Sequence, residues 1–341
     1  PFQLALLPMM SALAAGNTVV LKPSELASAT AALIEKMLAP AFPDTVRVVT
    51  GDGAVVVPEL IRAFHFDHIF FTGSVGVGRS IYRLAAERLI PVTLELGGKS
   101  PVIVEPDADL PTAARRIVMG KFINAGQTCI APDYLLVQEE IKDRLVQQMR
   151  ETMRQFYGGT PADSPDLGKI INGKRWETLI SYLPQGNIIC GGEHDRARLY
   201  IAPTLLEVAD FETPLMKEEI FGPLLPVVSY KTMEEALAII RRNPNPLAFY
   251  LFTRDKARQK AWMEALPFGG GCINNTDWHF TNPGMPFGGV GSSGIGAYHG
   301  KSGFDTFTHG KAVMRTPIWL DLDIKYPPFK GKMKWFKFFL K

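Results

Sequence analysis

The stretch HIFFTGSVGVGRSIYRLAAERLIPVTLEL, residues 68–96, decides the fold of this chain. It contains a short apolar run at 68–71, a helical pattern at 77–89 and a second apolar run at 92–96. Two short apolar runs separated by a helix of this length predict a βαβ unit with parallel strands. The stretch therefore favours an α/β fold built on a parallel sheet.

The same alternation of strand and helix continues toward the N-terminus. Apolar runs at 18–21 and 46–49 predict two more strands, and segments 28–39 and 53–64 predict the helices that follow them. The carboxyl ends of parallel strands meet at one edge of a sheet, where such folds bind their ligands. That edge receives the segments KPSE (22–25), TGDG (50–53), TGSVGVG (72–78) and ELGGKSP (95–101).

The rest of the chain mixes helices and strands without a low-complexity linker. We expect helices at 139–156, 232–242 and 255–266 and strands at 224–230, 247–253 and 270–275. The crossing near residue 96 therefore joins two packed domains. A glycine-rich stretch at 282–303 suggests that the backbone closely approaches another group there.

Composition excludes several classes of protein. The 341 residues are 46% hydrophobic and 21% charged, which suits two globular domains. The net charge of +3 depends on five lysines within residues 330–341; without them the chain carries −2, so nucleic-acid binding is not expected. No apolar run reaches the roughly 18 residues of a membrane span. The histidines form no metal-binding pattern, and we expect no metal site.

The three cysteines, Cys129, Cys190 and Cys272, show no disulfide spacing, which indicates a reducing compartment such as the cytoplasm. Cys190 and Cys272 lie in strand-like segments and are expected to be inert core residues. Cys129 differs because it follows the small polar residues NAGQT, which let a substrate approach backbone amides. A reactive nucleophile and a small buried hydrophobe are both consistent with this pattern.

Other candidate residues follow predicted strands. Glu95 precedes two glycines and could serve as a general base for Cys129, or merely cap a helix or form a salt bridge. The amides that start the helix after TGSVGVG could face a phosphate, although these glycines lack the usual dinucleotide-binding spacing. Lys22 and Glu25 could hold a ribose diol, or Ser24 could simply cap the next helix.

Several of these segments together resemble the aldehyde dehydrogenase superfamily. LELGGKSP and GQTCIAPDY are similar to its two active-site signatures. The resemblance extends in order over essentially the whole chain, through GNTVVLKPSE, FTGS, KEEIFGPLLPV (217–227), INN and PFGGVGSSGIGAYHGKSGFDTFTH (286–309). The last of these, with CIAPDY, resembles the class 3 branch, which handles fatty and aromatic aldehydes.

The resemblance implies oxidation of an aldehyde, medium-chain, long-chain or aromatic, to a carboxylic acid. Cys129 would attack the aldehyde, hydride transfer would leave a thioester, and Glu95 would activate the water that hydrolyses it. The aromatic segment 274–280 would line the aldehyde entrance, with surface packing as the alternative.

The resemblance also implies NAD or NADP as the cofactor. Glu25 could repel the 2′-phosphate of NADP, but its side chain could also turn away. The implied contacts are Lys22 and Glu25 with the adenosine ribose, Gly73, Ser74 and Gly78 with the pyrophosphate, and Glu219 and Phe221 with the nicotinamide ribose and ring.

The implied architecture has three parts and forms a homodimer. An incomplete, parallel Rossmann-type coenzyme domain would span residues 1–95, an α/β catalytic domain 96–302, and an oligomerisation segment with a basic aromatic tail 303–341. The family begins well before Pro1, and one oxyanion donor of the family is an asparagine upstream of it. We therefore expect a fragment that is nearly inactive and poorly soluble alone. Val75 also departs from the threonine that is common in the family's glycine-rich turn.

Two other functions compete with this interpretation. A non-catalytic family member would not need both Cys129 and Glu95, and a dehydrogenase that passes the thioester to coenzyme A should lack a base for water. The tail offers a separate hypothesis. In a helix, Met333, Phe336 and Leu340 share a face among lysines, which suits peripheral membrane contact or docking on a partner subunit equally well. The protein would then be cytoplasmic or attached to a membrane surface.

Overall fold

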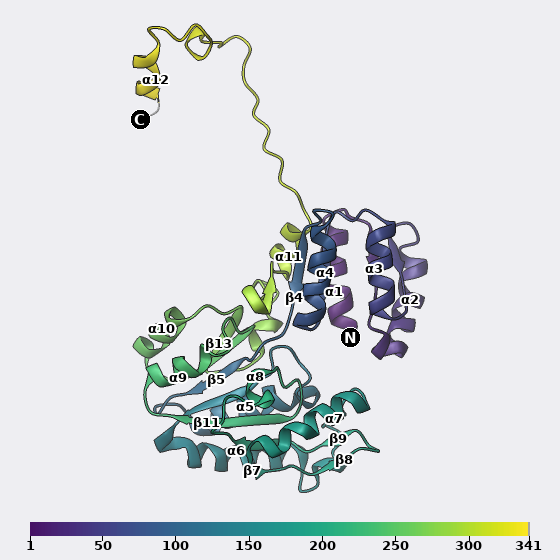
Figure 1. Ribbon diagram of the computed structural model, residues 1–341, viewed down its shortest axis with the longest axis vertical. Coiled ribbons are helices and arrows are strands. Elements are labelled where there is room, and N and C mark those ends of the chain that lie inside the picture. The colour runs from purple at the N-terminus through teal and green to yellow at the C-terminus, as the bar shows by residue number, and fades with distance from the viewer. Residues whose placement is uncertain (340–341) are drawn as a thin grey trace. The chain divides into compact units, whose positions relative to one another are not determined.

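A computed structural model describes residues 1–339 of the chain (Figure 1). The chain divides into two compact units, Pro1–Phe307 and Thr308–Lys341. Among the described residues, no helix is both long and apolar enough to cross a bilayer.

Four short strands and four helices make up the N-terminal part of the first unit. Strand β1 (Val19–Leu21) pairs in parallel with β2 (Val46–Val48), and β3 (Ile69–Thr72) pairs in parallel with β4 (Val92–Glu95). The helices are α1 (Phe2–Ala14), α2 (Ser28–Ala41), α3 (Gly53–Ala63) and α4 (Val75–Ala86). The predicted parallel βαβ units are confirmed, and each of these four strands agrees with its predicted range within one residue at each end.

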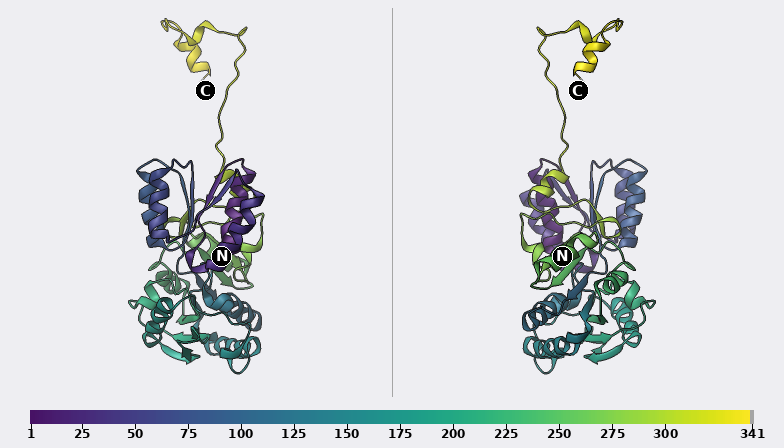
Figure 2. Two further views of the ribbon diagram at one scale, coloured as in Figure 1. Left: turned by 90° about the vertical axis from the view of Figure 1, so that its right-hand side faces the viewer. Right: turned by 90° about the vertical axis from the view of Figure 1, so that its left-hand side faces the viewer.

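The structure differs from the expected single sheet in one respect. Strands β1 and β2 form one sheet, and β3 and β4 form another, because no strand among the described residues bridges β1 and β3. Each pair has its own small core: α1 and α2 pack on the first through Met9, Ile34 and Leu38, and α3 and α4 pack on the second through Ile61 and Ala85. The views in Figure 2 separate the purple helices from the blue helices accordingly.

A seven-stranded sheet forms the core of the remainder. Its spatial order is β13 (Gly270–Ile273), β12 (Ala248–Phe252), β5 (Pro101–Val104), β6 (Tyr134–Gln138), β11 (Leu224–Tyr230), β10 (Thr204–Glu207) and β7 (Asn187–Cys190). All neighbours are parallel except β7, which runs antiparallel to β10. A small hairpin, β8 (His194–Asp195) and β9 (Tyr200–Ile201), lies apart from this sheet.

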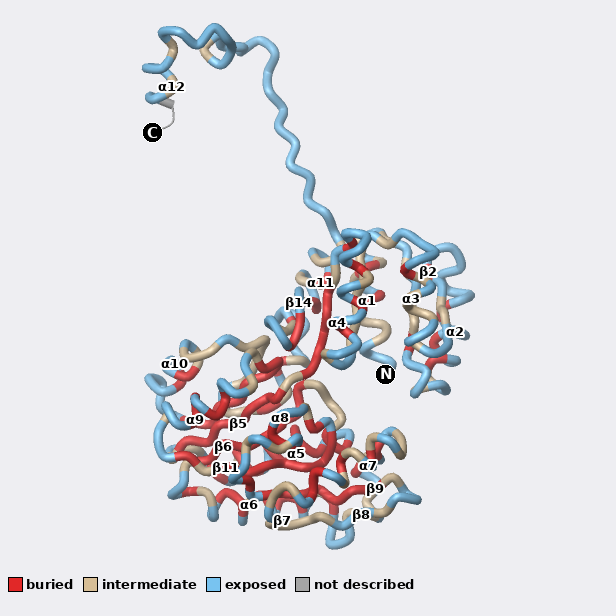
Figure 3. The backbone as a smooth tube through the Cα atoms, in the orientation of Figure 1, coloured by how far each residue is buried: buried red, intermediate tan, exposed pale blue. Residues whose placement is uncertain are grey.

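Side chains that alternate along these strands enter two different cores. Val102 and Val104 belong to the core that includes α5 (Leu110–Phe122) and α6 (Lys142–Tyr157), whereas Ile103 belongs to the other core. That second core is closed by α7 (Gly173–Tyr182), α8 (Pro214–Lys217), α9 (Met233–Ile240) and α10 (Lys256–Ala265). A sheet covered on both faces explains the continuous apolar runs of its strands, which are buried along the tube in Figure 3.

Capping side chains fix where six of the α-helices begin. In each case a side-chain oxygen accepts a backbone N–H from the first turn, which satisfies a donor that the helix itself leaves unpaired. The capping residues are Asp52, Ser74, Asp109, Asn172, Thr232 and Asp255. Helices α5 and α7, which the sequence analysis did not predict, follow two of these caps.

The two regions are joined at the end of β4. The chain passes from Glu95 to Pro101, the first residue of β5, through only Leu96–Ser100. The glycine-rich stretch returns to the same place, because β14 (Gly294–Ile295) pairs antiparallel with β4, with Gly294 opposite Glu95. The group that these glycines approach is therefore the backbone of β4. Helix α11 (Gly300–Thr306) then packs beside α1.

The second unit contains the short helix α12 (Met333–Phe339). Its apolar side chains are largely exposed: Met333 by 63%, Trp335 by 59% and Phe338 by 72%. Leu340, which the sequence analysis places on the apolar face of this helix, lies outside the described residues.

Candidate active site

A buried ion pair holds three separate segments together around the candidate site. Lys99 pairs with Asp133, and its Nζ also donates to the carbonyl oxygens of Leu215 and Glu218, at 2.9 Å each. The second oxygen of Asp133 accepts the backbone N–H of Ile220 at 2.9 Å. These contacts fix three segments against one another: the segment after β4, the segment that contains Cys129 and the segment that contains Glu219.

This pair is structural rather than catalytic, because both side chains are buried and all their contacts lie within the protein. Removing one partner would leave a buried, unpaired charge, which typically costs about 3–5 kcal/mol. Both residues lie within the two signature segments, LELGGKSP and GQTCIAPDY, but neither was predicted to have a role. Their partnership spans 34 positions, and no local pattern indicates it.

The turn before Cys129 has an unusual backbone. Asn124, Ala125 and Gly126 all have left-handed conformations, with φ of 52°, 53° and 72°. Such a conformation costs roughly 1–2 kcal/mol for each residue other than glycine. The side chain of Gln127 offsets this cost, since its Nε2 donates to the carbonyls of Asn124 (3.0 Å) and Lys169 (2.9 Å). The strained turn therefore presents Cys129 in one defined position.

Close packing explains the glycine at position 126. A Cβ atom on Gly126 would overlap the carbonyl group of Gly222, in the loop that contains Glu219 and Phe221. The Cys129 turn and this loop thus touch through two glycines.

Glu95 is the last residue of β4 and is only 3% exposed. Neither of its carboxyl oxygens has a hydrogen-bond partner among the described residues. Burial raises its pKa to about 9, so the carboxyl holds a proton at neutral pH. A buried acid without a structural partner is a candidate for proton transfer.

Glu219 reaches the same place from the opposite loop. Its carboxyl group occupies the space where a Cβ of Gly97 would lie, which explains why a glycine follows two residues after Glu95. Burial raises the pKa of Glu219 to about 8, and the negative charge of Asp133 contributes to the rise. The next aromatic residue, Phe221, has a φ of 44° and is 36% exposed.

Cys129 is a partly exposed free thiol. Its pKa is raised to about 12, first by burial and then by the negative charges of Glu219 and Glu95. Both carboxyls therefore lie within electrostatic reach of the sulfur. The structure brings together three residues that the sequence analysis named from separate segments.

Lys22 and Glu25 also meet, as a salt bridge after β1. Both lie beside Gly53, the first residue of α3, where a Cβ atom would be 3.4 Å from Lys22 Nζ. The hydrogen bond from Lys22 lowers the pKa of Glu25. Ser24 caps a short 3-10 helix through the N–H of Leu26, so the capping role and the lysine–glutamate pair exist side by side.

The glycine-rich turn after β3 divides into exposed and buried residues. Gly73 and Ser74 are exposed at the start of α4, where backbone N–H groups suit an anion. Gly78 is buried, and a Cβ there would lie 2.5 Å from Leu96 Cδ2, so its small size lets α4 pack against the end of β4. These residues and the Lys22–Glu25 pair leave accessible polar groups that fit a nucleotide.

Several buried polar residues near Cys129 were not singled out from the sequence. Lys121 is fully buried, its Nζ has no partner among the described residues, and burial lowers its pKa to about 8. Burial, with the charges of Glu95 and Cys129, raises the pKa of Tyr298. Only the fold brings Lys121 within electrostatic reach of Glu219, and Tyr298 within reach of Cys129.

The other cysteines have local surroundings of their own. Cys190 and Cys272 are partly buried at strand positions, as predicted. Cys272 Sγ lies 3.6 Å from Nδ1 of His279. Within residues 1–339, no three His, Cys, Asp or Glu side chains gather in a metal-binding group.

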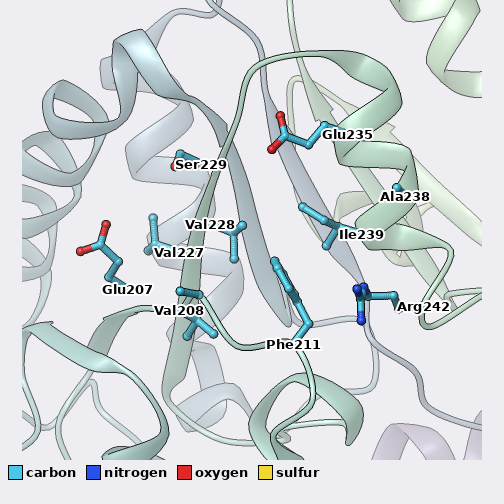
Figure 4. Close-up of a pocket in the computed structure, with 11 residues that line it drawn as sticks. Glu207, Val208, Phe211, Val227, Val228, Ser229, Glu235, Ala238, Ile239 and Arg242 are labelled. Carbon is cyan, nitrogen blue, oxygen red and sulfur yellow. The ribbon is translucent and has the colours of Figure 1, made fainter.

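A pocket of about 410 Å³ lies elsewhere, between β10, β11 and α9 (Figure 4). Its charged groups already have partners: Glu207 pairs with Lys142, and Arg242 pairs with Glu212 and lies over the ring of Phe211. None of the predicted site residues lines it. Its charged lining is therefore occupied by structural contacts.

The amino-acid sequence of this chain is similar to that of a known protein family. The model of the aldehyde dehydrogenase family matches residues 1–313. The 4,4'-diaponeurosporen-aldehyde dehydrogenase of Staphylococcus aureus is 46% identical, a match that covers 100% of this chain and 74% of the relative. The aldehyde dehydrogenase family 3 member A2 of Macaca fascicularis is 43% identical, over 100% of this chain and 70% of the relative.

Solved structures agree with these relatives. The substrate-bound state of Staphylococcus aureus AldH has a TM-score of 0.96 at 46% identity, covering 100% of this chain and 75% of that one. An indole-3-acetaldehyde dehydrogenase with NAD+ has a TM-score of 0.84 at 31% identity, with coverages of 91% and 65%. The glyceraldehyde-3-phosphate dehydrogenase GapN of Methanocaldococcus jannaschii with NADP has a TM-score of 0.82 at 31% identity, with coverages of 90% and 68%.

Proposed function

The chain belongs to the aldehyde dehydrogenase family, and from this premise we propose that Cys129 is its nucleophile and Glu95 its general base. The enzyme oxidises an aldehyde with NAD or NADP. One observation carries the proposal: a partly exposed cysteine lies within electrostatic reach of a buried carboxyl whose oxygens have no partner among the described residues.

In the first half-reaction, Cys129 gives its proton to solvent water and its sulfur attacks the aldehyde carbon. A C–S bond forms and the carbonyl oxygen becomes an oxyanion. The bound cofactor supplies the acceptor for the hydride that this carbon then loses. The C=O bond re-forms, and a thioester remains on Cys129. The rigid left-handed turn supports this role because it holds the sulfur in one position.

In the second half-reaction, Glu95 takes a proton from water as the water oxygen attacks the thioester carbon. The C–S bond breaks, the Cys129 thiolate leaves, and a carboxylic acid is released. Because the pKa of Glu95 is about 9, only its ionised fraction can act as a base, and this step should accelerate as the pH rises toward 9.

The cofactor would lie across the carboxyl edges of β1 and β3. In this proposal Lys22 and Glu25 hold the adenosine ribose, and the residues Gly73, Ser74 and Gly78 lie near the pyrophosphate. Glu219 and Phe221 orient the nicotinamide ribose and ring. Three observations support these cofactor contacts: the Lys22–Glu25 pair is accessible, the start of α4 is exposed, and Phe221 is exposed. The coenzyme domain over 1–95 and the catalytic domain over 96–302 would then meet at Glu95.

We propose that the substrate is an apolar aldehyde, of medium or long chain or aromatic. The aromatic segment 274–280 supports this, since Trp278 is 62% exposed there. The Staphylococcus aureus relative, by its name, acts on 4,4'-diaponeurosporen-aldehyde. Three free cysteines support a reducing compartment such as the cytoplasm. The exposed aromatic residues of α12 support attachment of a homodimer to a membrane surface.

The test replaces Cys129 by alanine in the full-length protein. The variant should lose aldehyde oxidation and retain NAD binding nearly unchanged, because the cofactor contacts lie elsewhere. Cys190→Ala is the matched control, since it removes a strand cysteine remote from the site. Product analysis with and without coenzyme A should show the free acid in both cases. Turnover of Cys129→Ala within about tenfold of the parent would exclude this nucleophile, because loss of the attacking group removes far more rate than that.

A further inference from the structure

A second cluster of titratable side chains lies next to Cys129. The hydroxyl of Tyr250, on β12, is 2.7 Å from the carbonyl oxygen of Ile130 and 2.9 Å from Oδ1 of Asp277. Tyr250 is fully buried, and Ile130 directly follows the nucleophile. A carboxyl on the loop after β13 is thus linked through one phenol to the backbone of the Cys129 turn.

The number of protons available to Tyr250 and Asp277 limits which hydrogen bonds this cluster can form. A tyrosine hydroxyl has one proton to donate, and a carbonyl oxygen can only accept. The shorter contact, to Ile130, uses the proton of Tyr250. The contact to Asp277 is then a hydrogen bond only if the carboxyl carries a proton and donates it to the phenol oxygen. A neutral Asp277 satisfies both contacts at once.

Asp277 occupies a constrained position. Its backbone is left-handed, with φ of 58°, and its carboxyl packs where a Cβ of Gly120 would lie, 2.8 Å from Oδ2. Thr276 anchors the loop by donating its hydroxyl to the carbonyl of Arg116 at 2.7 Å. The carboxyl therefore cannot simply turn toward water.

The charged and titratable groups around Asp277 are few. Lys121 of α5, Cys129, Cys272 of β13 and Tyr250 interact with it, and His279 packs on the Tyr250 ring with centroids 6.0 Å apart. Burial raises the pKa of Asp277 to about 7, while the hydrogen bond with Tyr250 and the charge of Lys121 oppose the rise. The pKa of His279 is lowered to about 4, so its ring stays neutral near pH 7.

We propose that Asp277 is a positioning residue for the reaction at Cys129: its protonated carboxyl donates to Tyr250, and the Tyr250 proton then holds the carbonyl of Ile130. The inference rests on the proposed role of Cys129. When Asp277 ionises, the carboxylate draws the Tyr250 proton to itself, because a charged acceptor is the stronger one. The Ile130 carbonyl then loses its partner, and the peptide after the nucleophile is no longer fixed.

The first test measures stability and needs no catalysis. An acid whose pKa is raised on folding, here from 3.8 to about 7, stabilises the fold below pH 4, and this stabilisation is lost as the pH rises through 7. Asp277→Asn can still donate to Tyr250 but does not titrate. The free energy of unfolding of the parent, relative to this variant, should therefore fall between pH 4 and 8.

Two further variants make the stability result unambiguous. Asp44→Asn removes an exposed carboxyl and should not reproduce the fall. If Asp277→Asn does not fold, Asp277→Ser supplies a second donor that does not titrate. If the difference in unfolding free energy between the parent and Asp277→Asn does not change from pH 4 to 8, the inference is overturned, whatever the role of Cys129.

The second test follows acylation in the enzyme. The ratio of the parent burst rate to that of Asp277→Asn should fall by about two- to tenfold as the pH rises through 7, the effect of one hydrogen bond. In a Tyr250→Phe background the ratio should not change with pH, since the link to Ile130 is gone. A ratio that keeps its pH dependence without the Tyr250 hydroxyl would show that Asp277 does not act through it.

Discussion

Cys129 lies among more negative charge than a reactive thiol usually does. Glu219 and Glu95 both raise its pKa, and both carboxyls are themselves buried with raised pKa values of about 8 and 9. The three groups therefore titrate as a set. Near pH 7 the carboxyls are largely neutral, and their effect on the sulfur grows as they ionise.

This coupling predicts how Cys129 reacts in the absence of cofactor. Glu219→Gln should accelerate alkylation of Cys129 by iodoacetamide about tenfold at pH 9, because removing one nearby charge lowers a thiol pKa by about one unit. At pH 6, where Glu219 is protonated, the variant and parent should react equally. Mass spectrometry of the Cys129 peptide measures both rates.

The neighbouring Glu218→Gln is the matched control. Its carboxyl group accepts a hydrogen bond from the hydroxyl of Tyr182 at 2.7 Å, whereas Glu219, Glu95 and Asp277 are the carboxyls that raise the pKa of Cys129. Equal rates for Glu219→Gln and the parent at pH 9 would mean that Glu219 does not control the thiol.

Residues differ in how well the sequence predicts them. Cys129, Glu95, Lys22 and Glu25 lie in local motifs, and the structure pairs Lys22 with Glu25 and brings Cys129 within electrostatic reach of Glu95. Lys121 and Asp277 have no such motif, since their significance comes from burial and from their electrostatic interaction with each other. Burial of a charged side chain depends on contacts between distant segments, which a single sequence does not reveal.

At the scale of elements, the left-handed turn at 124–126 is the feature most closely tied to Cys129. Gly126→Ala should lose stability for two reasons: alanine is strained at φ of 72°, and its Cβ would overlap Gly222. Gly16→Ala, with φ of 85° and open space around it at the end of α1, carries only the first penalty. The expected losses are roughly 1–2 kcal/mol for Gly16→Ala and about 1–3 kcal/mol more for Gly126→Ala.

Denaturant unfolding measures these losses, and burst kinetics measure their consequence. Displacing the turn by about 1 Å should slow acylation by roughly 100-fold in Gly126→Ala, while Gly16→Ala keeps the parent rate. Comparable stability and activity in the two variants would contradict the idea that this close approach positions Cys129.

The same turn shows where prediction from sequence stops. Apolar runs predicted the parallel strands because such strands need only a continuous local pattern. The left-handed conformations of Asn124 and Ala125 depend on Gln127 bonding to Lys169, 42 positions away. Helix α5 was missed as well, although Asp109 caps it, because its alanines and paired arginines give a weak apolar pattern.

At the scale of the whole molecule, the second unit has no catalytic role in this account. Its exposed aromatic residues and the lysines of residues 330–341 suit an anionic surface. Deleting the chain after Phe307 should weaken flotation with phosphatidylserine vesicles by at least about tenfold, since each lysine near such a surface contributes about 1 kcal/mol. Uncharged phosphatidylcholine vesicles are the control.

Sedimentation of the same truncated chain tests the alternative role of the tail, which is docking on a partner subunit. A change from dimer to monomer with unaltered vesicle binding would assign the tail to subunit docking and end the membrane proposal.

The central claim is that Cys129 carries the acyl group and Glu95 releases it. The most direct measurement is the peptide mass of Glu95→Gln after mixing with an aldehyde and NAD+. An amide cannot take the proton of water, so the thioester should accumulate, and the Cys129 peptide should gain the mass of the acyl group. The parent should show little of this adduct. An adduct on Cys190 or Cys272, or none on any cysteine while acylation proceeds, would contradict the account.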